Sequence, residues 1–227
     1  MYHADLHLIY KDRWINKCLG SIKNQTIGGY TVYEMCYGET QTQLWEGSIY
    51  FCQKMENHIE AMNYLLDIAF GDGCDVVFNI NLDDFYPTNR FSTQLRAINE
   101  GGHILCSSDF QLIYDRQDGK KNPPPIHMIY EGTDLEDDYY QKKIMSGLHI
   151  GRELENGHNI VCHPSVAYTK KFWNLFRPYD VTKLGREDMV MWKKVIEYGE
   201  SIHIIPEVLC YHRISDNQTG KKYSNFS

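Results

Sequence analysis

The sequence lacks paired cysteine spacings, long apolar runs and an excess of basic charge, and each absence excludes a class of protein. Its seven cysteines are scattered and odd in number, which indicates neither a disulfide framework nor a zinc site but reduced thiols in the cytoplasm. No apolar run approaches the ~20 residues of a transmembrane segment, and the N-terminus lacks signal-peptide character. The net charge of −7 argues against a nucleic-acid partner, because phosphate binding requires a basic face.

What remains is the composition of a packed globule. The chain has 227 residues, of which 42% are hydrophobic, and only seven prolines. This length suits one sizeable α/β domain. We expect a single catalytic domain over residues 1–215 and a C-terminal tail over 216–227.

Strand-like and helix-like patterns alternate over the first eighty residues. The expected order is a strand at Leu6–Tyr10, a helix at Asp12–Ile22, a strand at Tyr30–Tyr37, a helix at Glu56–Phe70 and a strand at Asp75–Ile80. Such alternation predicts an α/β fold with a central, mostly parallel sheet flanked by helices. Ligands of these sheets bind at the carboxyl ends of the strands.

The later pattern is less regular. We expect a helix at Pro87–Ile98, short strands at His103–Ser107 and Phe110–Tyr114, a polar lid-like loop at Asp115–Gly132, a helical region at 134–157, and β character at 160–162 and 165–168.

The first acidic cluster, Asn81-Leu82-Asp83-Asp84, directly follows the apolar run that ends at Ile80. Carboxylates at the end of a buried strand are suitable ligands for Mg²⁺ or Mn²⁺, with a diphosphate and water completing the coordination. Aspartate is also common in loops and at helix caps, so this motif alone leaves a structural role open.

The second acidic cluster, Gly185-Arg186-Glu187-Asp188, opens a helix-like stretch. Acidic residues at a helix start are stabilised by the helix dipole, and a carboxylate fixed there also suits a general base. His212, just past the apolar run 202–209, is a candidate third metal ligand. The two clusters together suggest a metal-assisted transfer reaction.

Six short motifs occur in the order found in family 2-type glycosyltransferases of the GT-A fold, and the sequence resembles this family over nearly its whole length. The motifs are Cys18 to Thr26 (CLGSIKNQT), Tyr33-Glu34, the helix with Asn57-His58 and Asn63, Asn81 to Asp84 with Pro87, Gly185 to Asp188 with Trp192 and Gly199, and Ile205 to Arg213 (IPEVLCYHR). The chain also resembles the compact transferases of large DNA viruses and of bacterial surface-glycan clusters. We expect it in the cytoplasm, which would be the host cytoplasm for a viral protein.

The resemblance implies transfer of a sugar from a nucleotide-diphosphate donor, UDP-sugar favoured, to a hydroxyl of a glycan or glycoprotein, with inversion. It makes Asp188, beside Glu187, the base. It assigns Mn²⁺ or Mg²⁺ to Asp83, Asp84 and His212. The implied donor-binding residues are Tyr10, Tyr37, Gly38, Glu39, Asn57, Asn81, Leu82 and Asp83.

Two departures from the family pattern keep alternatives open. Cys36-Tyr37-Gly38-Glu39 stands where the family carries Asp-Asp-Gly-Ser, and Asn81 replaces the first aspartate of the metal motif. An inactive GT-A module that binds a nucleotide or glycan is therefore a second reading. A sugar nucleotidyltransferase is a third, although Tyr10-Lys11-Asp12 is not the Gly-rich loop that such enzymes carry.

Overall fold

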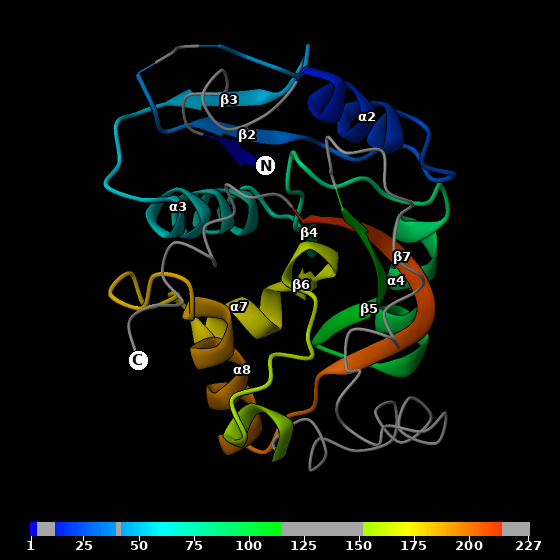
Figure 1. Cartoon of the computed structure of the whole chain (residues 1–227), viewed down its shortest axis with the longest axis vertical. Coiled ribbons are helices and arrows are strands. Elements are labelled where there is room, and N and C mark those ends of the chain that lie inside the picture. Colours follow the sequence, from blue (N-terminus) through cyan, green and yellow to red (C-terminus); the bar gives the residue numbers. More distant parts are fainter. Residues whose placement is uncertain (4–11, 40–41, 115–151, 215–227) are drawn as a thin grey trace.

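The computed structural model describes residues 1–3, 12–39, 42–114 and 152–214, and its strands form two sheets (Figure 1). The smaller sheet contains β1 (Tyr2–His3), β2 (Tyr33–Cys36) and β3 (Ile49–Cys52) in that order, and both pairings are parallel. Met35 lies opposite Tyr2 in the register, so the start of the chain adds directly to β2.

The larger sheet has the order β4-β6-β5-β7. Its strands are β4 (Val76–Phe78), β5 (Leu105–Tyr114), β6 (Ala167–Thr169) and β7 (His203–Ile214). β6 is antiparallel to both neighbours, whereas β5 and β7 run parallel. Most strand pairings are therefore parallel, as the sequence predicts. A cavity of about 280 Å³, lined in part by Tyr2, Met62 and Val77, lies where β1 and β4 approach each other.

Helices cover both sheets. They are α2 (Asp12–Lys23), α3 (His58–Gly71), α4 (Arg90–Gly101), α7 (Lys170–Phe176) and α8 (Glu187–Glu197), with a 3₁₀ turn η2 at His163–Ser165. α3 lies between the smaller sheet and α7 and contacts β1, β2 and β4 (Figure 1). None of the described helices combines the length and apolarity that crossing a membrane requires.

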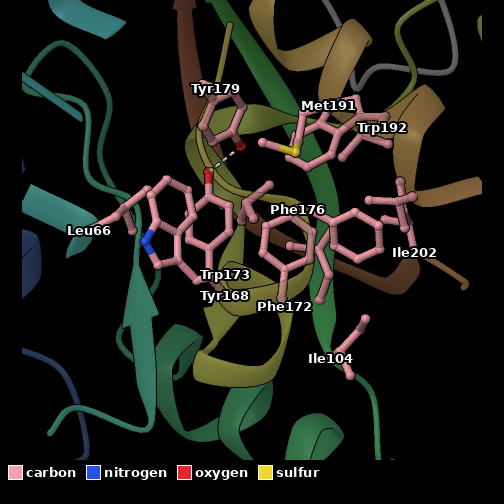
Figure 2. Close-up of a cluster of buried hydrophobic side chains, with 14 of the residues drawn as sticks. Leu66, Ile104, Tyr168, Phe172, Trp173, Phe176, Tyr179, Met191, Trp192 and Ile202 are labelled. Carbon is pink, nitrogen blue, oxygen red and sulfur yellow. Dashed lines mark hydrogen bonds between the residues drawn. The ribbon is translucent and has the colours of Figure 1, made fainter. Parts of the chain in front are cut away.

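The main core joins α3, β5, β6, α7 and α8 (Figure 2). Phe172 and Trp173 of α7 are fully buried, and Trp192 of α8 is buried beside them. The hydroxyls of Tyr168 and Tyr179 lie 2.9 Å apart inside this core. Because α8 is packed against it, the residues at the start of that helix have a fixed position.

The helices predicted at Asp12–Ile22 and Glu56–Phe70 are confirmed to within about two residues at each end. The two strands expected at 103–107 and 110–114 are one strand, β5, because its irregular register around Asp109 is absorbed without ending the pairing with β7. Residues 160–162 pack in the core but form no strand. β3 and α7 were not predicted.

Some expectations fall outside the described residues. These are the strand at Leu6–Tyr10, the loop at Asp115–Gly132 and most of the helical region at 134–157, of which residues 152–155 are helical.

Candidate active site

The turn that carries the first acidic cluster is pinned at its base. The Asp84 amide donates to the Asn81 carbonyl at 3.2 Å, and the Asn81 amide donates to the Tyr86 hydroxyl at 2.9 Å. Leu82 is buried in the cluster formed with Ile15 and Cys18 of α2. With Leu82 directed inward, the two aspartates that follow are fixed at the end of β4.

Asp84 is the anchored member of the first pair. Its carboxylate is fully buried, and its Oδ1 accepts hydrogen bonds from the Arg213 amide at 2.7 Å and from His212 Nδ1 at 3.0 Å. Burial lowers the pKa of His212, but the charge and hydrogen bond of Asp84 outweigh it and raise this pKa to about 10. The protonated ring therefore donates to Asp84.

Asp83 is the available member of the first pair. Its backbone carbonyl accepts from Arg213 Nε at 2.9 Å, while no hydrogen bond from another residue of the described ranges reaches its carboxylate. Burial, followed by the charge of Asp84, raises the pKa of Asp83 to about 7, and the charges of His212 and Arg213 oppose this rise.

The second pair begins α8. Gly185 has a φ of 76°, a left-handed conformation that glycine adopts without strain, and it directs the chain into the helix. Glu187 is buried, and its Oε1 lies 3.0 Å from His58 Nε2 at the start of α3. Burial is the largest single effect and raises the pKa of Glu187, but the hydrogen bond from His58, the Glu187 amide and the charges of His58 and His163 together outweigh it and lower this pKa. Glu187 is therefore ionised at neutral pH.

Asp188 is half-buried and firmly held. Its Oδ1 accepts from the Met189 amide at 2.7 Å, and its Oδ2 accepts from Asn159 Nδ2 at 2.5 Å. Burial, followed by the charge of Glu187, raises the pKa of Asp188 to about 6, while these two hydrogen bonds oppose the rise. The carboxylate is thus oriented, ionised near pH 7 and close to its point of protonation.

His163 of η2 is hydrogen-bonded to the segment before the first cluster and is influenced by the charge of the second. Its carbonyl accepts from Asn79 Nδ2 at 3.1 Å, two residues before the first cluster, and its Nε2 lies 3.0 Å from the Tyr168 hydroxyl. Burial lowers the pKa of His163 to about 4, with Glu187 opposing this shift and His58 adding to it. The ring is neutral at physiological pH and lies within electrostatic reach of the second pair.

The remaining residues of the expected donor site have varied surroundings. Tyr37 packs against the apolar cluster of Met35 on β2, Gly38 follows it, and Glu39 is exposed 4.0 Å from Lys54. Asn57 caps α3, since its Oδ1 accepts from the amides of residues 59 and 60. Tyr10 lies outside the described residues.

The donor atoms at the first pair suit a divalent cation that also binds a diphosphate. Asp83 offers a carboxylate, and His212 uses Nδ1 for Asp84. In many metal sites a carboxylate bound to one ring nitrogen in this way orients the imidazole for a cation at the other. Within the described ranges, no cluster of three or more His, Cys, Asp or Glu side chains could enclose an ion. Few protein ligands together with substrate phosphates are usual for Mg²⁺ sites.

Sequence reasoning missed His58, Asn159 and His163 as parts of this arrangement. Asn159 and His163 flank the apolar run 160–162, and His58 enters the sequence analysis only as part of a motif. The available signal was the position of polar residues beside buried segments. It could not identify their partners, because Asn159 contacts Asp188 across 29 positions and His58 contacts Glu187 across 129.

Solved structures similar to this one support the fold. S. aureus TarS 1–349 in complex with UDP has a TM-score of 0.58 and 12% identity, over 94% of this chain and 59% of that chain. Its complex with UDP-GlcNAc has a TM-score of 0.57 and 11% identity, over 92% and 57%. The mannosyltransferase PcManGT from Pyrobaculum calidifontis, in complex with GDP-Man and Mn²⁺, has a TM-score of 0.60 and 10% identity, over 96% and 56%.

The chain therefore has the α/β GT-A fold of these glycosyltransferases and spans less than three fifths of their length. No protein-family model matches the sequence, and no curated protein matches it either. At 10–12% identity, the likeness speaks for the fold alone.

Proposed function

We propose that this chain is a glycosyltransferase that moves a sugar from a nucleotide-diphosphate donor, with a UDP-sugar favoured, to a hydroxyl of a glycan or glycoprotein. The observation that carries the proposal is the presence, within a GT-A fold, of two carboxylate pairs, each with one buried member held by a histidine and one half-buried member. Solved neighbours in complex with UDP, UDP-GlcNAc and GDP-Man support the donor class.

In this proposal Asp188 is the general base. The Met189 amide and Asn159 orient its carboxylate, and a pKa of about 6 leaves it ionised at neutral pH yet able to take a proton. The acceptor hydroxyl gives its proton to Asp188 as its oxygen attacks the anomeric carbon. Attack from the face opposite the leaving diphosphate inverts that carbon.

Asp83 and His212 would hold Mn²⁺ or Mg²⁺, and Asp84 would orient His212. The cation supplies charge neutralisation for the departing diphosphate. His212 must lose its proton to bind a metal, so metal affinity is expected to rise with pH. Asn81 lies beside these residues and would contact the ribose of the donor. Tyr37, Gly38 and Glu39, at the end of β2, would surround its nucleobase.

A ligand-binding screen tests the donor class first. Thermal unfolding is measured with UDP-GlcNAc, GDP-mannose and dTDP-glucose, each with Mn²⁺ and with EDTA. A selective, metal-dependent stabilisation supports the proposal, because a ligand that binds only the folded state raises the melting temperature. If no donor stabilises the protein under either condition, the proposed donor class is wrong.

Turnover separates an enzyme from a binding module. The departure at Cys36-Tyr37-Gly38-Glu39 is the feature that favours a module without activity. Release of the nucleoside diphosphate from the stabilising donor, dependent on Asp188, supports the enzyme. Donor binding without release, in the presence of Mn²⁺ and a mixture of glycan acceptors, favours the module.

A further inference from the structure

We propose that His58 is a positioning residue for the base: it holds Glu187 as a fixed, ionised neighbour of Asp188 and so sets the pH range over which Asp188 can accept a proton. This inference rests on the proposed function for its catalytic meaning. Its electrostatic part concerns the protein alone and can be measured without a substrate.

The geometry shows a histidine placed for this contact. His58 is the first residue of α3, directly after the capping Asn57, and its ring stacks on Tyr2 at a centroid distance of 6.3 Å and an angle of 23°. Its Nε2 lies 3.0 Å from Glu187 Oε1, and the two side chains are only 19% and 11% exposed. The capping role of Asn57 does not require a histidine next to it.

Glu187 depends on this contact. Its Oε2 is buried and has no hydrogen-bond partner among the described residues, so His58 is the side chain that holds the carboxylate. Without the hydrogen bond from His58 this carboxylate would be easier to protonate, because burial penalises its charged form. His58 thus preserves the negative charge next to Asp188.

The other titratable groups near the pair come from three elements. They are His163 of η2, Tyr168 of β6 and Tyr179, between α7 and α8. Burial lowers the pKa of His163 and raises those of both tyrosines, so all three are neutral near pH 6. The Glu187 charge is then the neighbouring charge that acts on Asp188 over the relevant pH range.

The charge of Glu187 determines the direction in which the pKa of Asp188 shifts. A negative neighbour disfavours a second negative charge, so an ionised Glu187 raises the pKa of Asp188. Removing the charge of Glu187, or the hydrogen bond that maintains it, should lower the pH at which Asp188 is half-protonated.

The test is a carbon-13 NMR titration of protein labelled at its aspartate carboxyl carbons, in EDTA. The Asp188 resonance is identified by its loss in Asp188→Asn. Glu187→Gln keeps an oxygen for His58 but removes the charge, and we expect the Asp188 midpoint to fall by roughly 0.5–1 pH unit. His58→Phe keeps a ring against Tyr2 but cannot donate, and it should lower the midpoint in the same direction.

Two variants act as controls. His58→Gln retains a donor for Glu187 and should leave the midpoint closer to that of the unchanged protein than His58→Phe does. Lys171→Gln removes an exposed ion pair, in which Nζ lies 3.2 Å from Glu200, and should leave the midpoint unchanged. An unchanged Asp188 midpoint in Glu187→Gln overturns the inference, even if His58→Phe fails to fold.

The same variants distinguish this inference from the proposed function. Once a donor is turned over, the acidic limb of the pH profile of kcat/KM should move with the NMR midpoint. A purely structural role of His58 would lower the rate at all pH values without moving the limb. If Asp188→Asn retains full turnover while the Asp188 midpoint still shifts in Glu187→Gln, Asp188 is not the base. The effect of Glu187 on the pKa of Asp188 would still stand.

Discussion

The two carboxylate pairs have the same internal division but different surroundings. In each pair one member is anchored by a histidine, Asp84 by His212 and Glu187 by His58. The other member has a pKa raised by burial and by its neighbour, to about 7 in Asp83 and about 6 in Asp188. The Asp-Asp and Glu-Asp pairs thus each contain one carboxyl with a raised pKa, although they lie on different elements of the fold.

The difference lies in how the non-anchored member is held. The Asp83 carboxylate receives no hydrogen bond from another residue of the described ranges, whereas Asp188 is fixed by Asn159 and the Met189 amide. An unengaged carboxylate suits an incoming cation, and an oriented one suits proton transfer. This comparison is the physical basis for giving the two pairs different roles.

The strongest test of the comparison is Asp188→Asn. We expect turnover to fall by roughly 10²–10⁴-fold with unchanged donor affinity, because only the transition state needs the base. Initial rates and calorimetry measure the two quantities. Asp180→Asn is the matched control, since among the described residues that carboxylate accepts hydrogen bonds only from Thr182, and its loss should not affect turnover. Full activity of Asp188→Asn would contradict the assigned role.

Asp83→Ala tests the first pair. We expect the Mn²⁺-dependent part of donor binding to disappear, while the weak binding measured in EDTA is retained. Calorimetry with the stabilising donor measures both. The control is Asp75→Asn, which changes an exposed side chain at the opposite end of β4. This variant should bind the donor normally. Unchanged affinity of Asp83→Ala in Mn²⁺ would show that this carboxylate is not a ligand.

The anchors should differ in their contribution to stability. Asp84→Ala removes a fully buried carboxylate and leaves the partly buried His212 without its charge partner, and we expect a loss of about 3–5 kcal/mol in the free energy of unfolding. Glu187→Ala should cost less, because the Glu187 side chain is 11% exposed and accepts from one other side chain, whereas Asp84 is fully buried and accepts from both His212 and the Arg213 amide. Urea denaturation at pH 6 in EDTA gives both values, and equal losses would break the comparison.

The pH dependence of this anchor has a defined sign. Asp84 raises the pKa of His212 to about 10. The contribution of this contact to the free energy of unfolding is therefore fully present below the usual histidine pKa of about 6.5. It is lost as the pH rises from there toward 10. Asp84→Ala should lack this alkaline loss of stability.

The smallest expected effect is that of Asn159→Ala. Asp188 loses a hydrogen bond to its ionised form, so its pKa should rise above about 6, by roughly half a unit. The NMR midpoint of Asp188 should move upward, opposite to the shift in Glu187→Gln. Asn156→Ala, at an exposed position on the same segment, should not move it. A downward shift in Asn159→Ala would contradict the geometry.

Local patterns were sufficient for elements whose residues repeat with a clear period. α2 buries Trp14, Ile15, Cys18 and Ile22 on one face, and this spacing is visible in the sequence. β3 was missed because its four residues are only partly buried and show no alternation. α7 was missed because seven residues are too few for a helical period to stand out.

By itself, the sequence determined the α/β class, the main helices and the positions of both acidic clusters, because helix periodicity and strand-end carboxylates are local properties. Only the tertiary structure decided which histidine anchors which carboxylate. His212 reaches Asp84 across 128 positions and His58 reaches Glu187 across 129. These contacts, together with burial, shift the pKa values of Asp83, Glu187 and Asp188, and burial exists only once the sheets and helices have packed.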